Sequence, residues 1–179
     1  MAEITDKGRG IRDMFQTIAP RYDFLNRLLS LGIDRYWRSF AVGQLSVPEG
    51  GKVLDIATGT GDVALRVAAT TPDSVSIVGE DFTQGMLVLG KEKIKNSPFA
   101  DRITLVNAPC ESIPHPDSLF DGITIAFGIR NVVDREAGLS EMCRVLKPGG
   151  RAVILEFSTP RNRFFGALYQ FYFRQLLPF

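Results

Sequence analysis

The sequence is poor in the residues that bind metal ions or form disulfides. Cys110 and Cys143 are its only cysteines, and His115 is its only histidine. This set is too small for the usual zinc clusters and is a poor basis for a disulfide framework. We therefore expect no metal site, and we expect a protein of the reducing cytoplasm.

The sequence also lacks a long apolar run and a large excess of charge of one sign. No apolar run approaches the ~20 residues needed to span a bilayer, and residues 1–10 do not resemble a secretory signal. Any membrane contact should therefore be peripheral. With 21 basic and 20 acidic residues, the net charge of +1 creates no broad positive field. Nucleic acid is not expected as a partner.

The order of apolar patterns predicts one α/β domain within the 179 residues. Residues 11–45 carry apolar side chains at helical spacing, and residues 1–45 should form a lid of short helices. Residues 46–160 should form the α/β domain, and residues 161–179 an aromatic C-terminal helix. Within the domain we predict strands at 52–57, 75–80, 103–107, 122–126 and 152–156, and helices at 62–70, 83–95 and 135–146. This alternation indicates a parallel sheet with right-handed crossovers.

A glycine-rich loop, Asp55–Asp62 (DIATGTGD), follows the first predicted strand and opens the first helix of the domain. Gly59 and Gly61, with Ala64 at the third small position, fit the fingerprint of dinucleotide-binding proteins. Asp81 follows at about the ~20-residue spacing expected of a ribose-binding acid. This motif alone does not separate a nicotinamide cofactor from S-adenosylmethionine.

The charge around the loop favours a cofactor without phosphate. A pyrophosphate at this helix start would lie close to Asp55 and Asp62, and like charges at ~4 Å repel by roughly 4 kcal/mol at an effective dielectric constant near 20. S-adenosylmethionine has no phosphate and carries cationic groups. In this interpretation Gly59 and Gly61 let the backbone approach the cofactor, and Asp55 orders the loop amides or receives the ammonium through water. Asp62 could also simply cap its helix.

The segment after the second predicted strand supplies candidates for the ribose and adenine. Asp81, with Phe82 beside it, is placed to accept both ribose hydroxyls, and Glu80 competes for that role. Thr83 is expected to cap the next helix. Met86 could lie against the adenine or belong to the core.

Three segments together resemble the class I S-adenosylmethionine-dependent methyltransferases, which have a Rossmann-like parallel sheet. They are the loop at 55–62, Asp-Phe-Thr-Gln-Gly-Met-Leu at 81–87, and Arg-Val-Leu-Lys-Pro-Gly-Gly-Arg at 144–151. Residues 14–23, 126–132 and 155–160 further resemble the menaquinone and ubiquinone C-methyltransferases. This resemblance implies methyl transfer to a ring carbon of a polyprenylated quinol.

The resemblance also implies cofactor contacts from specific residues. It points to Thr60, Asp81 and the pair Pro109-Cys110, with Ala126 at a position where the family often has Ser. Pro109 departs from the usual Asn or Asp, so we expect the adenine to be bordered by backbone groups of Cys110. Tyr22 is interpreted as part of the lid over the cofactor, and Phe15 and Trp37 as lining an apolar substrate passage or packing in the core.

The acceptor chemistry requires a group that stabilises an oxyanion, because a quinol carbon becomes nucleophilic when a ring hydroxyl loses its proton. Arg130 is the candidate, with Asn131 as a second polar contact. Arg130 could instead pair with Asp134 or Glu136 on the surface. His115 is an alternative general base, although it lies between prolines in a predicted loop.

Members of this family continue beyond the position of Phe179, so we expect the C-terminal strands of the sheet to be missing from this sequence. The apolar face of residues 163–174 would then need cover from the domain itself, a second copy of the chain or a membrane surface. Three functions remain open: a quinol C-methyltransferase, a cofactor-binding module that has lost catalysis, and a nicotinamide-dependent oxidoreductase.

Overall fold

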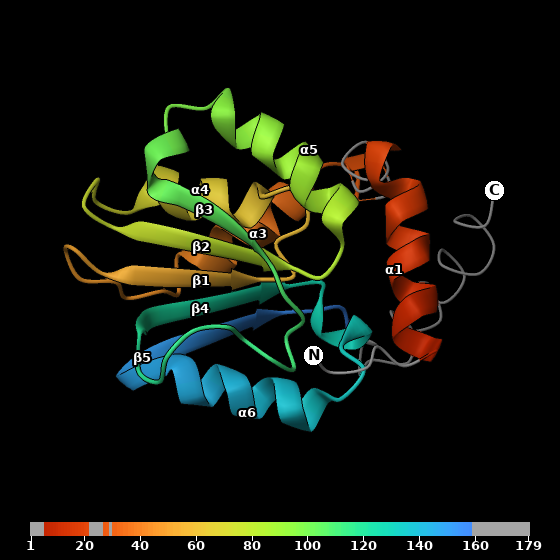
Figure 1. The fold of residues 1–179 in the computed structure, drawn as a ribbon. Coiled ribbons are helices and arrows are strands. Elements are labelled where there is room, and N and C mark those ends of the chain that lie inside the picture. Colours follow the sequence, from red (N-terminus) through yellow and green to blue (C-terminus); the bar gives the residue numbers. More distant parts are fainter. Residues whose placement is uncertain (1–5, 22–26, 29, 159–179) are drawn as a thin grey trace, which may run out of the picture.

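The structure is a computed structural model that describes residues 6–21, 27–28 and 30–158 (Figure 1). Tyr22 and the predicted C-terminal helix at 161–179 lie outside these residues. None of the described helices is long and apolar enough to cross a membrane.

Five parallel strands form one sheet, in the order β3-β2-β1-β4-β5. Their bounds are β1 Lys52–Ile56, β2 Ser76–Asp81, β3 Ile103–Asn107, β4 Phe120–Ala126 and β5 Leu146–Leu155. The chain builds outward from β1 to β3, then returns to the other side of β1 to add β4 and β5. This change of direction makes a topological switch point beside β1, where the carboxyl ends of neighbouring strands diverge and ligands bind in open α/β sheets.

Helices cover both faces of the sheet because successive strand side chains point to opposite faces. On one face Val53 and Ile77 pack with α3 (Asp34–Val42), α4 (Asp62–Thr70) and α5 (Gln84–Lys95). On the other face Leu54 and Ile123 pack with α6 (Arg135–Val145). The domain therefore has the three-layer α/β architecture that the alternating pattern predicted.

The predicted order of strands and helices is confirmed, but the start of β5 was predicted wrongly. The Pro148-Gly149-Gly150 segment was expected to separate α6 from a strand at 152–156. Instead β5 begins at Leu146, directly after α6, and Leu146 pairs with Phe120 before an irregularity in the ladder. Pro148 is tolerated because β5 forms an edge of the described sheet, where one side of the strand needs no ladder hydrogen bonds.

The N-terminal region is helical, as its apolar spacing predicted. It contains α1 (Asp6–Ile18), the short 3₁₀ helix η1 (Ala19–Arg21) and α3. Figure 1 shows α1 standing across the carboxyl ends of the strands. The backbone N–H of Gly85, at the start of α5, donates a hydrogen bond to Gln16 Oε1 at 3.0 Å, so α1 is tied to the helix that follows β2.

Candidate active site

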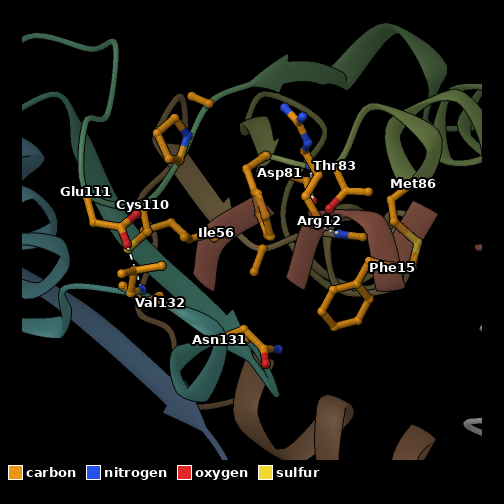
Figure 2. A pocket seen from close by; sticks show the side chains of 18 of the residues that line it. Arg12, Phe15, Ile56, Asp81, Thr83, Met86, Cys110, Glu111, Asn131 and Val132 are labelled. Atoms are coloured by element: carbon orange, nitrogen blue, oxygen red, sulfur yellow. Dashed lines mark hydrogen bonds between the residues drawn. The ribbon is translucent and has the colours of Figure 1, made fainter. Parts of the chain in front are cut away.

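The loops after β1, β2, β3 and β4 enclose a cavity of about 340 Å³ together with α1 (Figure 2). Seven of the residues predicted to contact a cofactor line it: Gly59, Asp81, Phe82, Met86, Pro109, Cys110 and Ala126. One of the two predicted catalytic residues, Asn131, lines it too. Tertiary structure thus brings together positions that are 72 residues apart in the sequence, from Gly59 to Asn131.

Two glycines and one alanine give the glycine loop its conformation. Gly59 and Gly61 have φ values of 56° and 83°, and Ala57 at the end of β1 has φ 52°. Glycine adopts this left-handed region at no steric cost, whereas a side chain at φ > 0 is strained. Gly59 faces the cavity, and Gly61 is the residue from which α4 begins. The loop can therefore present its backbone closely to a ligand.

Asp55, in β1, anchors this loop through hydrogen bonds. Its carboxylate is buried and accepts hydrogen bonds from the hydroxyls of Thr58, at 2.6 Å, and Thr124, at 2.7 Å. Burial raises the pKa of Asp55 to about 6, against the lowering effect of these hydroxyls. Asp55 does not line the main cavity but borders a small hollow that shares Ala57, Gly59 and Ala126 with it. Its observed role is to tie the loop after β1 to β4.

Asp81 and Glu80 lie on opposite faces of β2, which separates the two candidates for the ribose. Asp81 lines the cavity, while Glu80 is not among the lining residues. Asp81 Oδ2 accepts from the N–H of Gly59 at 2.9 Å, and Oδ1 from the N–H of Thr83 at 2.8 Å. A carboxylate oxygen has two lone pairs, so each oxygen retains capacity for a ribose hydroxyl. Burial raises the pKa of Asp81 from its ordinary value.

Asp62 has a different electrostatic role from the one expected. Its carboxylate pairs with the guanidinium of Arg38 and, at 2.8 Å, with Lys93 Nζ. These cations hold the pKa of Asp62 below its ordinary value although burial opposes them. A paired carboxylate repels phosphate much less than a free one. The repulsion between phosphate and a free Asp62 carboxylate, from which a phosphate-free ligand was predicted, therefore does not apply.

Lys93, which pairs with Asp62, also connects Thr60 to α5. Lys93 Nζ donates a hydrogen bond to the Thr60 hydroxyl at 2.8 Å as well as to Asp62. Thr60 is buried and borders the small hollow beside Asp55 rather than the main cavity. Thr60 follows Gly59, which lines the main cavity, but does not line that cavity itself. Its contact with the cofactor remains a prediction.

Met86, Pro109 and Cys110 give the cavity an apolar surface that suits a flat, uncharged ring. Met86 lines the cavity with a side chain that is 2% exposed, and Pro109 and Cys110 follow from the loop after β3. Burial raises the pKa of the Cys110 thiol to about 12, so the group is a neutral apolar surface at physiological pH. Thr83 is the N-cap residue of α5 as expected, but its side chain makes no capping hydrogen bond.

The two catalytic candidates are placed differently. Asn131 lines the cavity, whereas the Arg130 side chain is half exposed and is not among the lining residues. Arg130 Nη1 pairs with Glu156 Oε1 at 2.7 Å, a partner that differs from the Asp134 and Glu136 considered from the sequence. The role of Arg130 in catalysis therefore remains a prediction, and its position beside Asn131 keeps it next to the cavity.

His115 does not face the cavity. Its Nε2 lies 3.4 Å from Glu80 Oε1, and its ring contacts Phe120 edge-on at a centroid distance of 5.2 Å. Burial lowers the pKa of His115. The lining residues of the cavity do not include it, and this position gives no support to His115 as a general base.

Three charged residues that line the cavity, Arg12, Glu111 and Asp134, were not predicted from the sequence to do so. Gly8 and Arg12 of α1 line the cavity together with Phe15, and the contact of Phe15 with a substrate stays a prediction. These three residues follow the i, i+4, i+7 spacing of one helix face, so helical periodicity could have found them. Glu111 Oε1 accepts from the backbone N–H of Val133 at 2.8 Å, a link between loops that only the fold creates.

Comparison with known proteins decides the family. Residues 2–179 match the sequence profile of the ubiE/COQ5 methyltransferase family. The chain belongs to this family. It is 66% identical over 178 residues to a ubiquinone/menaquinone biosynthesis C-methyltransferase, UbiE, of Geobacter sulfurreducens, an alignment that covers 99% of this chain and 70% of the relative.

A second family member is a demethylmenaquinone methyltransferase of Deinococcus radiodurans. It is 47% identical over 173 residues, and the alignment covers 97% of this chain and 70% of the relative. The chain thus spans 70% of the length of each of these two relatives. The family resemblance predicted from residues 14–23, 126–132 and 155–160 is confirmed.

Solved structures confirm the fold. The [4+2]-cyclase SpnF matches with a TM-score of 0.75 and 20% identity, over 87% of this chain and 62% of that one. A SAM dependent methyltransferase from Aquifex aeolicus matches with a TM-score of 0.63 and 21% identity, over 70% of this chain and 66% of that one. At 20% and 21% identity, these matches establish only that this chain has a Rossmann-like fold.

Proposed function

We propose that this chain transfers the methyl group of S-adenosylmethionine to a ring carbon of a polyprenyl quinol, either demethylmenaquinol or a ubiquinone precursor. The main support for this proposal is the position of Asp81. Its buried carboxylate lies at the end of β2 and accepts a hydrogen bond from the backbone N–H of Gly59 in the glycine loop. Asp81 lines the cavity at the carboxyl end of β2, the strand next to β1, and the chain belongs to a methyltransferase family.

The residues present fit the cofactor. Asp81 offers unused lone pairs to two ribose hydroxyls, Met86 and Cys110 offer an apolar surface to the adenine, and Gly59 allows close approach of the methionyl part. The contacts of Phe82, Pro109 and Ala126 are proposed on the same basis, since all three line the cavity.

When bound, S-adenosylmethionine would supply a methyl group on a cationic sulfur, and the chain would align the acceptor carbon with it. The sulfur–methyl bond would break as the new carbon–carbon bond forms, and the ring carbon would then release its proton to water. Direct displacement needs no covalent nucleophile on the protein, so positioning and exclusion of water account for most of the protein's contribution. Arg12 and Phe15 from α1 close the cavity on one side. We propose that Asn131 hydrogen-bonds the acceptor's oxygen and that Arg130, beside it, stabilises negative charge developing there.

Methyl transfer is tested directly with radiolabelled S-adenosylmethionine and demethylmenaquinol. We expect label in the quinol fraction and none when the quinol is omitted. A folded chain that binds S-adenosylmethionine but transfers no label, while a UbiE relative does so in parallel, would establish the cofactor-binding module. The family membership disfavours the nicotinamide-dependent oxidoreductase, and calorimetric titration with NAD should give no binding signal.

A polyprenyl acceptor resides in a membrane, so we propose that the chain makes peripheral contact with a bilayer through its N-terminal helices. The support is a group of exposed apolar side chains at α3 and just before it: Leu31, Ile33, Tyr36 and Phe40, with Leu31 79% exposed. Co-sedimentation with anionic vesicles tests this contact. Failure to sediment, together with a dimer in solution, would assign the same surface to a second copy of the chain.

A further inference from the structure

Phe127 has a backbone conformation that is unfavourable for its residue type. It follows β4 directly and has φ 57°, in the left-handed region that bulky side chains rarely adopt. Its backbone N–H donates to the carbonyl of Leu155 at 2.7 Å, which fixes it against the end of β5. Strained backbone held by its surroundings often occurs where a side chain must be aimed at a ligand. Phe127 lines the cavity.

Two further aromatic rings hold Phe127 in place. Phe157 stacks on it at a centroid distance of 4.7 Å and an interplanar angle of 26°. Trp37 of α3 meets both rings edge-on, at 6.4 Å from Phe127 and 5.7 Å from Phe157. Such pairs contribute beyond the burial of their area. We call Trp37, Phe127 and Phe157 the aromatic wall.

Two guanidinium groups lie against the aromatic wall. Arg38 Cζ is 5.9 Å from the centroid of Phe127, and Arg130 Cζ is 5.5 Å from that of Phe157. Both guanidinium groups are oriented by a carboxylate, Asp62 and Glu156 respectively. Neither guanidinium lines the cavity, and Phe127 is the one ring of the aromatic wall that does. A cation on a ring favours an electron-rich aromatic partner at that ring, and a quinol ring that is losing its hydroxyl proton is such a partner.

We propose that Phe127 contacts the acceptor's ring, and that Trp37 and Phe157 are positioning residues that hold Phe127 in its strained conformation. The inference rests on the proposed function for the identity of the acceptor. The cofactor's ribose and adenine are assigned to Asp81, at the end of β2, and Met86, in α5, whereas Phe127 lines the cavity from the loop after β4, which we assign to the second substrate. Asn131 lines the same cavity from the next turn of chain and can reach the ring oxygens.

Trp37 is the sole tryptophan of the chain and contacts Phe127, so its fluorescence reports on the proposed ring site without any turnover. The probe is 2,3-dimethyl-1,4-naphthoquinone, whose blocked ring carbons do not add to the exposed thiol of Cys143. We expect saturable quenching of Trp37 that persists in the presence of S-adenosylhomocysteine. Absence of saturable quenching, or displacement of the probe by S-adenosylhomocysteine, would overturn the inference.

A variant and its matched control locate the contact. Phe127→Leu keeps an apolar side chain but removes the ring, and should weaken the naphthoquinone's affinity by about three- to tenfold, the range for loss of one aromatic pair. Phe99→Leu is the control, because Phe99 is also a partly buried ring with a guanidinium over it, from Arg102 at 6.0 Å, but lies outside the cavity. It should leave the affinity unchanged. Equal effects of the two substitutions would contradict the contact.

The kinetic measurement separates substrate contact from general loss of structure. In Phe127→Leu, KM for demethylmenaquinol should rise about three- to tenfold while the Kd for S-adenosylmethionine stays the same, and Phe127→Tyr should restore KM. A parallel loss of cofactor affinity would mean that Phe127 is structural. If the wild-type chain binds the naphthoquinone through Phe127 but transfers no methyl group, the proposed function fails and the ring site stands.

Discussion

Replacing Asp81 with Asn should weaken cofactor binding strongly, because this carboxylate has two tasks. Its two oxygens accept the backbone N–H groups of Gly59, at 2.9 Å, and Thr83, at 2.8 Å, and in the proposed complex they also accept the ribose hydroxyls. Asn retains one oxygen and turns an NH₂ group toward a backbone donor. The side chain then loses one bond to the loop and one to the ribose.

The magnitude follows from the hydrogen bonds lost. A bond to a charged group contributes about 1.5–3 kcal/mol, and each ~1.4 kcal/mol corresponds to a tenfold change in Kd. Loss of one such bond to the ribose predicts a Kd for S-adenosylmethionine about 10- to 150-fold higher. Calorimetric titration at about pH 8 measures it, with thermal unfolding to confirm that the variant is folded.

Glu80→Gln is the matched control for this experiment. Glu80 is the neighbouring residue, is 1% exposed and carries the same type of group, but it is not among the residues that line the cavity. Its substitution should leave the cofactor's Kd unchanged. If Asp81→Asn is folded and binds S-adenosylmethionine as tightly as the wild type, or if Glu80→Gln weakens binding equally, the assignment of Asp81 to the ribose is refuted.

Other predictions concern the charges around the site. Arg130→Ala should slow methyl transfer with near-normal cofactor affinity, whereas an unchanged rate would show that the pair with Glu156 is purely structural. Burial raises the pKa of Glu80 from 4.5 to about 7, so its contribution to stability is present below about pH 4.5 and is lost as pH rises through about 7. Glu80→Gln should therefore raise Tm relative to wild type more at about pH 8 than at about pH 5, and an equal difference at both pH values would contradict this. Arg38→Met removes one cation from Asp62 and should lower the free energy of unfolding by about 1.5–3 kcal/mol in urea denaturation; an unchanged midpoint would argue against it.

The sequence by itself determined the order of elements and the glycine loop, because these depend on local periodicity and backbone freedom. Alternating apolar runs and helical stretches predicted the parallel sheet, and the glycines marked the turn after β1. The family motifs likewise depend on short, contiguous strings of residues. Local patterns did not place the start of β5, since its pairing of Leu146 with Phe120 depends on a partner strand.

Tertiary structure alone decided which carboxylate faces the cavity and which charges are neutralised. Asp81 and Glu80 are adjacent in the sequence, and only the orientation of β2 distinguishes them. Asp62 was interpreted as a free negative charge, but Arg38, which is 24 residues away, pairs with it. The aromatic wall likewise joins α3 to the ends of β4 and β5. Contacts between residues far apart in the sequence arise from packing of the layers, and no local pattern contains them.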